Sequence, residues 1–544
     1  MRIKICQKTI SCLNVHYFKG VIYHDGSVID SKEAFYNFIN INKQSDDNIE
    51  NLLAKCIGVF AFAIEISGNI SIVVDIIRAF PLFVSVNDSE IDIYDNLNEY
   101  KDNKPLNNKA IEEFISSGYV YGTQTVFQDI YALQAGEILS INQNSWNSIR
   151  YFRFKPNNKV IVNTNDIHIY FDKILIAVFN RMLLISPKIN RWVVPLSGGH
   201  DSRIIVNYLY RLGIKNVICY SYGKINNEQS VISKQVADTL GYEWHFIEYT
   251  EDKWQNLHET NLIEKFIDFG FNGGSTANLQ DFLAVYELNK QGIVKKNDIF
   301  VPGHTLDFIT GGHLNNLDKK CRNKKDAINR VIKQHTIRKK SSLIKKAIGE
   351  LFDQSTVNPC EFQEYFNWQE RQAKFIVNSI KVYEFFGYES RIPFWDKELV
   401  DFWLTVPSVY RIKRNIFYLC EKKGILIEKI KDIPYAGDRN KQTINNIKER
   451  LKQIIKRIIP TAWTSQLLRF STKNIVTNEG LNLIFNKQTD SINHLIRPLN
   501  DFPESISPYF KNILMRPPYR IEIHFLCRLY TIRLQINKKI NNEN

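Results

Sequence analysis

The 544-residue sequence is poor in several features that would assign it to a special class of protein. It has only eight cysteines, scattered from Cys6 to Cys527, with no CxxC pair and no spacing typical of metal ligands. We therefore expect reduced thiols and neither a disulfide framework nor a zinc site. It has no run of about 20 uncharged apolar residues, and its beginning, MRIKICQKTISCLNV, lacks the apolar core of a signal peptide. These absences predict a cytoplasmic protein with no membrane insertion.

Internal repeats and long low-complexity segments are also absent, and the composition is that of a globular protein, with 44% hydrophobic and 24% charged residues. The length suggests three or four domains, or two large domains and an extension. The net charge of +14 is unevenly distributed: residues 1–150 hold 12 basic and 18 acidic residues, and the remainder carries +20. The segment Asp318–Lys346 alone holds 12 basic and two acidic residues. This asymmetry predicts a difference between domains and makes an anionic partner plausible.

Residues 1–155 have the pattern of a β-rich domain. Cys56–Ile66 and Ile70–Ile77 are apolar, and Ser67-Gly68-Asn69 between them forms a turn signal, so the pair predicts a β-hairpin. Leu133–Gln143 is a later strand candidate.

The pattern changes near residue 155 to an alternation of helices and short apolar strands. Helical periodicity covers Asn165–Ile185, Ser202–Leu212 and Glu228–Leu240, and strands are expected at Arg191–Leu196, Asn216–Gly223, Glu243–Tyr249 and Asn297–His304. Such alternation is typical of βαβ units and a parallel sheet. The rest of the chain is mainly helical in pattern, including Lys397–Thr405, and is basic from about residue 445 onward.

The segment PLSGGHDSR, Pro195–Arg203, lies between a predicted strand and a predicted helix. Gly198 and Gly199 allow a tight loop and close approach of a ligand, and the N–H groups that open a helix attract anions. Ser197 and Ser202 add hydroxyl donors, whereas the Asp201 carboxylate suits a magnesium ion that would bridge it to phosphates. The loop is not a Walker sequence. The alternative is a plain strand–turn–helix corner with an accidental glycine pair.

The SGGHDS loop resembles the SGGxDS pyrophosphate loop of the ATP-pyrophosphatases, and the chain is similar to the asparagine synthetase family within them. Three other segments carry the resemblance: Gly58–Phe83, PGHTLDFITGGH at Pro302–His313, and YESRIPFWDKELVDFWLTVP at Tyr388–Pro407. The resemblance implies an α/β fold in three parts. A glutaminase-type, Ntn-hydrolase-like α+β domain would cover residues 1–155, a parallel-sheet, adenine-nucleotide α-hydrolase-like PP-loop domain residues 160–440, and a helical extension residues 441–544.

This family activates a carboxylate with ATP, releases pyrophosphate, and lets ammonia or an amine attack the acyl-adenylate. By resemblance, pyrophosphate binds at Ser197, Gly198, Gly199, Asp201 and Ser202. Asp201 and Asp307 would hold Mg²⁺, and backbone groups from Cys219 to Gly223 would contact adenine. The substrates implied are a small carboxylate acceptor and a donor that is ammonia, glutamine or an amine.

The N-terminal region departs from the family pattern. Arg2 follows Met1 where the family has its catalytic cysteine, and Cys6 and Cys12 are internal and lack the adjacent α-amine that activates that thiol. Arg78 stands where the family has glycine. We expect a retained fold without glutaminase activity.

The synthetase region departs at two further places. His304 stands where asparagine synthetases have glutamate, so it is a candidate base for the attacking amine or a residue that only binds the loop. Glu389 is a second candidate for the amine, or a partner of Arg391. The family lysine that stabilises pyrophosphate has no firm counterpart; the candidates are Lys429, Lys431, Arg439 and Lys441. Asn272–Ser275 is a candidate substrate loop or a plain glycine turn.

The leading prediction is an ATP-dependent amide-forming ligase whose acceptor is not aspartate. The alternatives are a glutamine-hydrolysing asparagine synthetase, a tRNA-modifying ATP-pyrophosphatase, which the basic charge favours, and a scaffold without catalysis. No RNA-binding module is visible, so an anionic small molecule is expected before a nucleic acid. A homodimer is left open.

Overall fold

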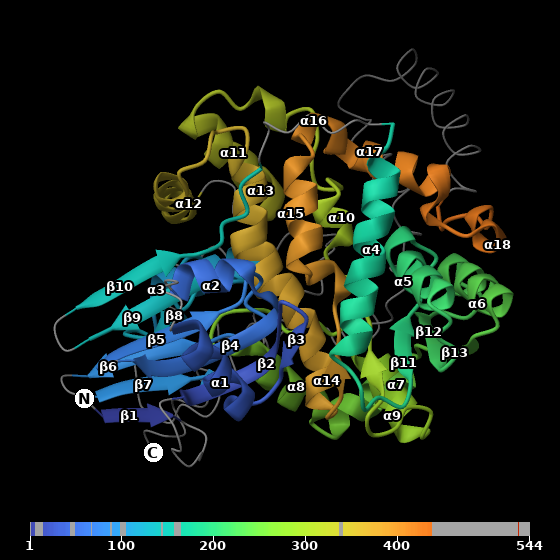
Figure 1. Ribbon diagram of the computed structural model, residues 1–544, viewed down its shortest axis with the longest axis horizontal. Coiled ribbons are helices and arrows are strands. Elements are labelled where there is room, and N and C mark those ends of the chain that lie inside the picture. The colour runs from blue at the N-terminus through green and yellow to red at the C-terminus, as the bar shows by residue number, and fades with distance from the viewer. Residues whose placement is uncertain are drawn as a thin grey trace.

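The structure is a computed structural model that describes residues 2–5, 15–43, 49–66, 68–87, 90–97, 105–142, 145–156, 165–336, 341–437 and 531. The predicted helical extension at 441–544, Thr531 excepted, lies outside the described residues, as do Cys6 and Cys12. Figure 1 shows the N-terminal strands on one side of the molecule and the strands β11 to β13 on the other, with helices between them.

The N-terminal region consists of two sheets and short helices. Its strands are β1 (Arg2–Ile5), β2 (Val15–His24), β3 (Ser27–Ile29), β4 (Ile57–Ile66), β5 (Asn69–Val74), β6 (Phe83–Asn87), β7 (Glu90–Tyr94), β8 (Tyr131–Ala132), β9 (Glu137–Ile141) and β10 (Trp146–Arg150). Its helices are α1 (Lys32–Lys43), α2 (Ile49–Lys55) and α3 (Asn108–Ser117). One sheet has the order β10-β9-β5-β4-β2-β3, and the other has the order β1-β7-β6-β8.

Strand β4 shows why these layers form. Alternate side chains of a strand point to opposite faces, and both faces of β4 are apolar. Phe60 and Phe62 pack with residues of α1 and α2, whereas Ala61 and Ala63 pack with residues of the four-stranded sheet. The six-stranded sheet is therefore buried between helices and a second sheet. The predicted hairpin of β4 and β5 is confirmed.

The later region contains the predicted parallel sheet. Its strands are β11 (Trp192–Pro195), β12 (Val217–Gly223), β13 (Glu243–Glu248), β14 (Ile299–Phe300) and β15 (Glu389–Ser390), in the order β13-β12-β11-β14-β15. All four neighbouring pairs are parallel. The described chain is thus a mixed α/β structure, as expected.

Helices surround this sheet, and α4 and α15 cross the middle of the molecule (Figure 1). They are α4 (Ile167–Leu184), α5 (His200–Arg211), α6 (Glu228–Leu240), α7 (Glu251–Glu259), α8 (Leu262–Phe271), α9 (Phe282–Lys290), α10 (Leu306–Ile309), α11 (Lys324–His335), α12 (Ser342–Ser355), α13 (Phe362–Phe366), α14 (Lys381–Phe385), α15 (Lys397–Thr405), α16 (Ser408–Arg411), α17 (Asn415–Cys420) and α18 (Glu428–Lys431). A π-helical stretch, Asn367–Ile376, and a 3₁₀ turn, Val377–Ile380, join α13 to α14.

Several predicted strands are shorter in the structure. The strand expected at Ile70–Ile77 ends at Val74, because the Asp75 carboxylate accepts hydrogen bonds from the N–H groups of Phe60, Ile77 and Ala79 and turns the chain. The strand expected at Asn297–His304 spans only Ile299–Phe300.

The domain boundaries near residues 155–160 and 440 and the Ntn-like character of the N-terminal region stay predictions. Among the described residues, no helix combines the length and the apolar character that crossing a bilayer requires.

Candidate functional site

The SGGHDS loop connects the carboxyl end of β11 to the first turn of α5, as predicted. Ser202 Oγ lies 3.0 Å from both the backbone N and the Oγ of Ser197, and the N–H of Gly199 donates to Ser197 Oγ at 3.1 Å. The contacts between Ser197 and Ser202 therefore hold the two ends of the loop together. This leaves the start of α5 facing the edge of the sheet where the carboxyl ends of β11, β12 and β14 meet.

Two glycines allow other segments to approach this loop closely. A Cβ on Gly198 would lie 2.9 Å from Ala436 Cβ, and Ala436 N–H donates to Gly198 O at 2.9 Å. A Cβ on Gly303 would lie 3.1 Å from Ser202 N. Glycine at these positions is thus required by packing, because a side chain would displace the neighbouring backbone.

A cavity of ≈ 460 Å³ opens beside the loop. Its lining combines loop residues with the ends of neighbouring strands and helices: Pro195, Ser197, Gly199, His200, Asp201, Ser202, Tyr222, Asn278, Gln280, Asp281, Pro302, Gly303, His304, Asp307, Ser379 and Arg414. Cavities at the carboxyl ends of parallel strands are the usual ligand sites of open α/β sheets. The structure therefore gathers Ser197, Gly199, Asp201, Ser202, His304 and Asp307 at one site.

Asp201 has two partners across the cavity. One carboxylate oxygen pairs with Arg414 Nη2 at 2.6 Å, and the other accepts the backbone N–H of Asp307 at 3.0 Å. Burial raises the pKa of Asp201, and the positive charge of Arg414 opposes this shift. Arg414 thus holds the carboxylate that the sequence assigned to magnesium.

Asp307 lies at the start of α10 with its side chain 45% exposed toward the cavity. Its Oδ2 lies 3.0 Å from His313 Nε2, and His313 Nδ1 contacts Asn367 Nδ2 at 2.9 Å. Burial raises the pKa of Asp307. The hydrogen bond and charge of His313, and then the charge of Arg414, outweigh burial and lower this pKa to about 2. Asp307 is therefore a carboxylate throughout the physiological pH range.

His304 lines the cavity in the turn that leads from β14 to α10. Burial lowers the pKa of its imidazole, and the charges of Asp281 and Asp307 oppose this shift. The imidazole is consequently neutral at pH 7 and able to accept a proton. The next residue, Thr305, has a left-handed φ of 78° and is held by hydrogen bonds to Gln372 and Trp395. Such strain is common at functional sites.

Four sequence-predicted site residues are absent from the cavity lining. Cys219 is fully buried within β12, and Gly223 pairs with β13. Gly198 packs under Ala436. Glu389 is 71% exposed and pairs with Arg391 at 2.8 Å, so the geometry gives no support to its role at the amine. The residue of β12 that lines the cavity is Tyr222 instead.

Of the candidates for the family lysine, Lys429 and Lys431 are also absent from the lining. Lys429 donates to Tyr210 at 2.9 Å and Lys431 pairs with Glu428 on α18. Arg439 and Lys441 lie outside the described residues. Arg414 is the cation that contacts the site, and the sequence analysis missed it because the surrounding stretch, RIKRN, has no recognisable motif. Its own φ of 62° and the φ of 54° at Lys413 form an irregular turn that no local pattern predicts.

A comparison with protein families agrees with the SGGHDS resemblance. A sequence model of the asparagine synthase family matches residues 192–466. No curated protein sequence matches the chain. Among solved structures, NMN synthetase from Francisella tularensis is 12% identical with a TM-score of 0.20, over 38% of this chain and 93% of that chain. Because the family match spans half of the 544 residues, the chain belongs to the asparagine synthase family.

Proposed function

We propose that this protein is an ATP-dependent ligase that joins a small carboxylate to ammonia or an amine. A carboxylate oxygen attacks the α-phosphorus of ATP, the bond to the β-phosphate breaks, and pyrophosphate leaves. The amine nitrogen then attacks the acyl carbon of the acyl-adenylate, AMP leaves, and the amine loses a proton. The observation that supports this most is the convergence of the serine-glycine loop, Asp201, Asp307 and Arg414 on one cavity.

The loop and α5 supply the donors for pyrophosphate. α5 is a 12-residue helix, long enough for its N-terminal N–H groups to attract an anion. Ser197 and Ser202 can rotate their hydroxyls from each other toward phosphate oxygens. Arg414 lies against Asp201 on the same side of the cavity, where it can pair with a phosphate in the role that the resemblance gives to the family lysine. Cys219 and Gly223 keep only a backbone role toward adenine in this proposal.

Asp201 and Asp307 fit a magnesium ion held between protein and substrate. Mg²⁺ is commonly bound by one or two carboxylates together with substrate phosphates, and the two carboxylates here face one cavity. Among the described residues, no group of three or more histidine, cysteine or acidic side chains could hold a metal by itself. When bound, the ion neutralises charge on the departing pyrophosphate. Arg414 must then release Asp201.

His304 is the residue placed to assist the second step. Its neutral imidazole lines the cavity together with Asp281 and Asp307. It can accept the proton that the amine loses when it attacks the acyl carbon. The neighbouring carboxylates favour a cation, so an ammonium ion or an alkylammonium group is attracted to the same end of the cavity.

Pyrophosphate release tests the proposal. Purified protein is given ATP and Mg²⁺ with panels of small carboxylates, and with ammonium, glutamine or alkylamines as donors. We expect release that depends on one class of carboxylate, with an amide and AMP as products. Release that requires RNA would contradict the proposal in favour of RNA modification, and absence of release in every panel would contradict catalysis.

Asp201→Asn is the matched test of the site. We expect it to reduce pyrophosphate release by about 100-fold or more, since removal of one charge-stabilising group has effects of this size. Asp353→Asn is the control, because Asp353 is 60% exposed on α12 and pairs only with Lys324. Full activity of Asp201→Asn would refute the site assignment, and loss of activity in both variants would refute its specificity.

A further inference from the structure

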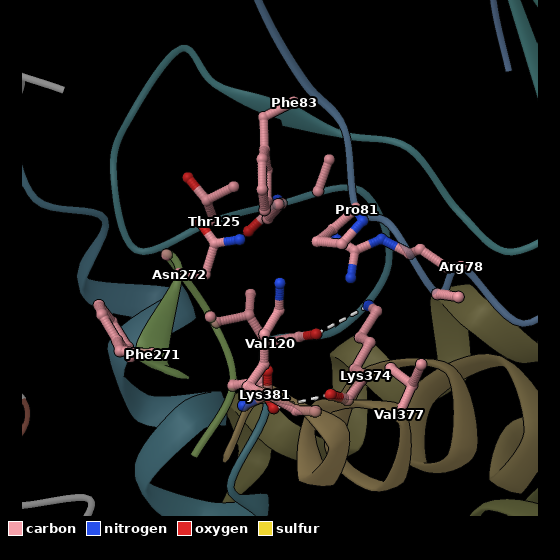
Figure 2. Close-up of a pocket in the computed structure, with 17 residues that line it drawn as sticks. Arg78, Pro81, Phe83, Val120, Thr125, Phe271, Asn272, Lys374, Val377 and Lys381 are labelled. Atoms are coloured by element: carbon pink, nitrogen blue, oxygen red, sulfur yellow. Dashed lines mark hydrogen bonds between the residues drawn. The ribbon is translucent and has the colours of Figure 1, made fainter. Parts of the chain in front are cut away.

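A second cavity, of ≈ 30 Å³, lies where the N-terminal region meets later parts of the chain. Arg78 and Phe83 border it from the segment around β6, and Val120 from the loop after α3. Lys374 borders it from the π-helical stretch after α13, and Lys381 from the start of α14. In Figure 2, the Arg78 side chain points from its loop toward the middle of the cavity, near the ammonium group of Lys374. The cavity is thus lined by cations from two regions.

Arg78 is a buried cation with N–H donors that have no acceptor among the described residues. It is 7% exposed, and its guanidinium carbon lies 5.2 Å from the centre of the Phe83 ring. Its Nε donates to Leu133 O at 2.7 Å. Within the described part of the chain, its two terminal nitrogens make no hydrogen bond and no ion pair. Burial lowers the pKa of Arg78 to about 10, so the side chain remains charged at neutral pH.

The other polar side chains around the cavity already have partners. Lys374 Nζ donates to Val120 O and Gly122 O at 2.8 Å and to Glu370 at 2.6 Å, which uses its three N–H groups. Lys381 pairs with Glu384 at 2.6 Å. The charges of Glu370, Glu137 and Asp75 act on Arg78, but among the described residues none of the three forms a hydrogen bond or ion pair with it. An unmatched, desolvated guanidinium therefore faces the cavity, and such a charge is costly unless an anion joins it.

We infer that this cavity binds a carboxylate group, which the terminal nitrogens of Arg78 hold in a two-pronged hydrogen-bonded pair. Guanidinium and carboxylate match in this planar geometry. The volume has room for about two water molecules, which suits a carboxylate and excludes a nucleotide or pyrophosphate. The group can belong to a small free acid or to the end of a larger molecule.

This site does not depend on the proposed ligase reaction. Val377 and Asn378 line the small cavity, whereas the next residue, Ser379, lines the candidate active site. The two cavities are therefore separate but share one 3₁₀ turn. Binding measured without ATP tests the small cavity alone.

Isothermal titration of the full-length chain with acetate, glutarate and inorganic phosphate, in low-chloride HEPES buffer, is the test. We expect one acetate site per chain. Glutarate binds there as well if the carboxylate can come from a larger molecule, and fails to bind if only a small free acid fits. Phosphate binding that exceeds acetate binding, or no acetate binding at all, would overturn the assignment.

Arg78→Gly is the decisive variant. Arg78 has a left-handed φ of 60°, which glycine adopts without strain, so the variant is expected to fold. We expect its acetate affinity to fall at least tenfold, whereas Arg322→Gln, at an exposed arginine, leaves the affinity unchanged. Arg78→Lys keeps the positive charge but not the planar pair of N–H donors, so its acetate affinity should lie between those of the wild type and Arg78→Gly. Equal affinity in wild type and in both Arg78 variants would overturn the inference.

Discussion

The two cavities of this protein share a 3₁₀ turn, Val377–Ile380, and differ in how their charges are arranged. The candidate active site mixes Asp201, Asp307 and Arg414 at the edge of one parallel sheet and has a volume of ≈ 460 Å³. The small cavity of ≈ 30 Å³ is lined by Arg78, Lys374 and Lys381, which belong to regions far apart in the sequence. A site of mixed charge suits a metal-bound polyanion, whereas a lining whose charged side chains are all cations suits a bare anion.

The two cavities also contain two kinds of buried cation, paired and unpaired. Arg414 and Lys374 each pair with a carboxylate, whereas Arg78 has none within the described part of the chain. A buried cation that is paired with a carboxylate stabilises the fold around it. An unpaired buried cation destabilises the fold, but its N–H donors stay available to a ligand. The sequence suggested that positive charge serves an anionic partner. Buried cations in fact line two distinct cavities.

The largest expected effect is on stability, from Lys374→Met. This substitution leaves the buried carboxylate of Glu370 without its ammonium partner and removes a donor from the carbonyls of Val120 and Gly122, of which Gly122 O keeps the amide of Gln134. We expect a loss of about 3–5 kcal/mol in the free energy of unfolding, measured by urea denaturation.

The matched control for this loss is Arg78→Gly in the same cavity, which removes an unpaired buried cation and should leave the urea midpoint unchanged or raise it. A double variant, Lys374→Met with Glu370→Leu, should recover part of the loss because the Glu370 carboxylate is no longer buried without its partner. If Arg78→Gly cost as much as Lys374→Met, the distinction between paired and unpaired cations would be wrong.

The next effect is on catalysis, from Arg414→Gln. If Arg414 exchanges Asp201 for the phosphates of ATP, its loss should lower kcat/KM for ATP by about 100-fold, and Arg414→Lys should restore part of it. Lys413→Gln is the matched control, because Lys413 is the neighbouring cation in the same irregular turn and is exposed. Equal, small effects of the two substitutions would show that Arg414 only supports the fold.

Arg414 also marks the limit of what the sequence could predict. The SGGHDS loop, the helix after it and the parallel pairing of strands such as β11, β12 and β13 follow from local signals: apolar runs, glycines and periodicity. The contact of Arg414 with Asp201 joins residues 213 positions apart through consecutive left-handed residues. No local propensity encodes such a contact, because tertiary packing alone fixes the conformation of that turn.

The N-terminal region illustrates the same limit. The hairpin of β4 and β5 was predicted from its apolar runs, but its end was not, because Asp75 accepts N–H groups both from Phe60 on β4 and from the following residues Ile77 and Ala79. Arg78 was noticed as a substituted glycine, and its left-handed φ of 60° explains why glycine suits that position. That its guanidinium would face a cavity formed with Lys374 required the packing of two distant regions.

A smaller effect is expected from Gly303→Ala, which tests how closely the loop after β14 must approach the candidate active site. The added methyl would lie 3.1 Å from Ser202 N and 3.2 Å from Asp201 C, so the start of α5 must shift by a few tenths of an ångström. We expect pyrophosphate release to fall about tenfold, since small misplacement of binding groups is costly. Gly349→Ala, whose Cβ meets only Ile328 Cδ1 at 3.5 Å, should have no effect. A normal rate for Gly303→Ala would show that the loop can adapt.

The smallest expected effect concerns the pH dependence of the proposed reaction. Burial lowers the pKa of His304, so its imidazole stays neutral below pH 6.5, and kcat/KM should fall only as the pH drops through that lowered value. Asp281 and Asp307 oppose the shift, and Asp281 is held by hydroxyl donors from Tyr220 and Tyr383. Asp281→Asn keeps an oxygen for those hydroxyls but removes the charge, so the acid limb should move to still lower pH by less than about one unit. Asp353→Asn should leave the limb in place, and a limb above pH 6.5 in the wild type, or one that Asp281→Asn moves upward, would remove His304 from the role of base.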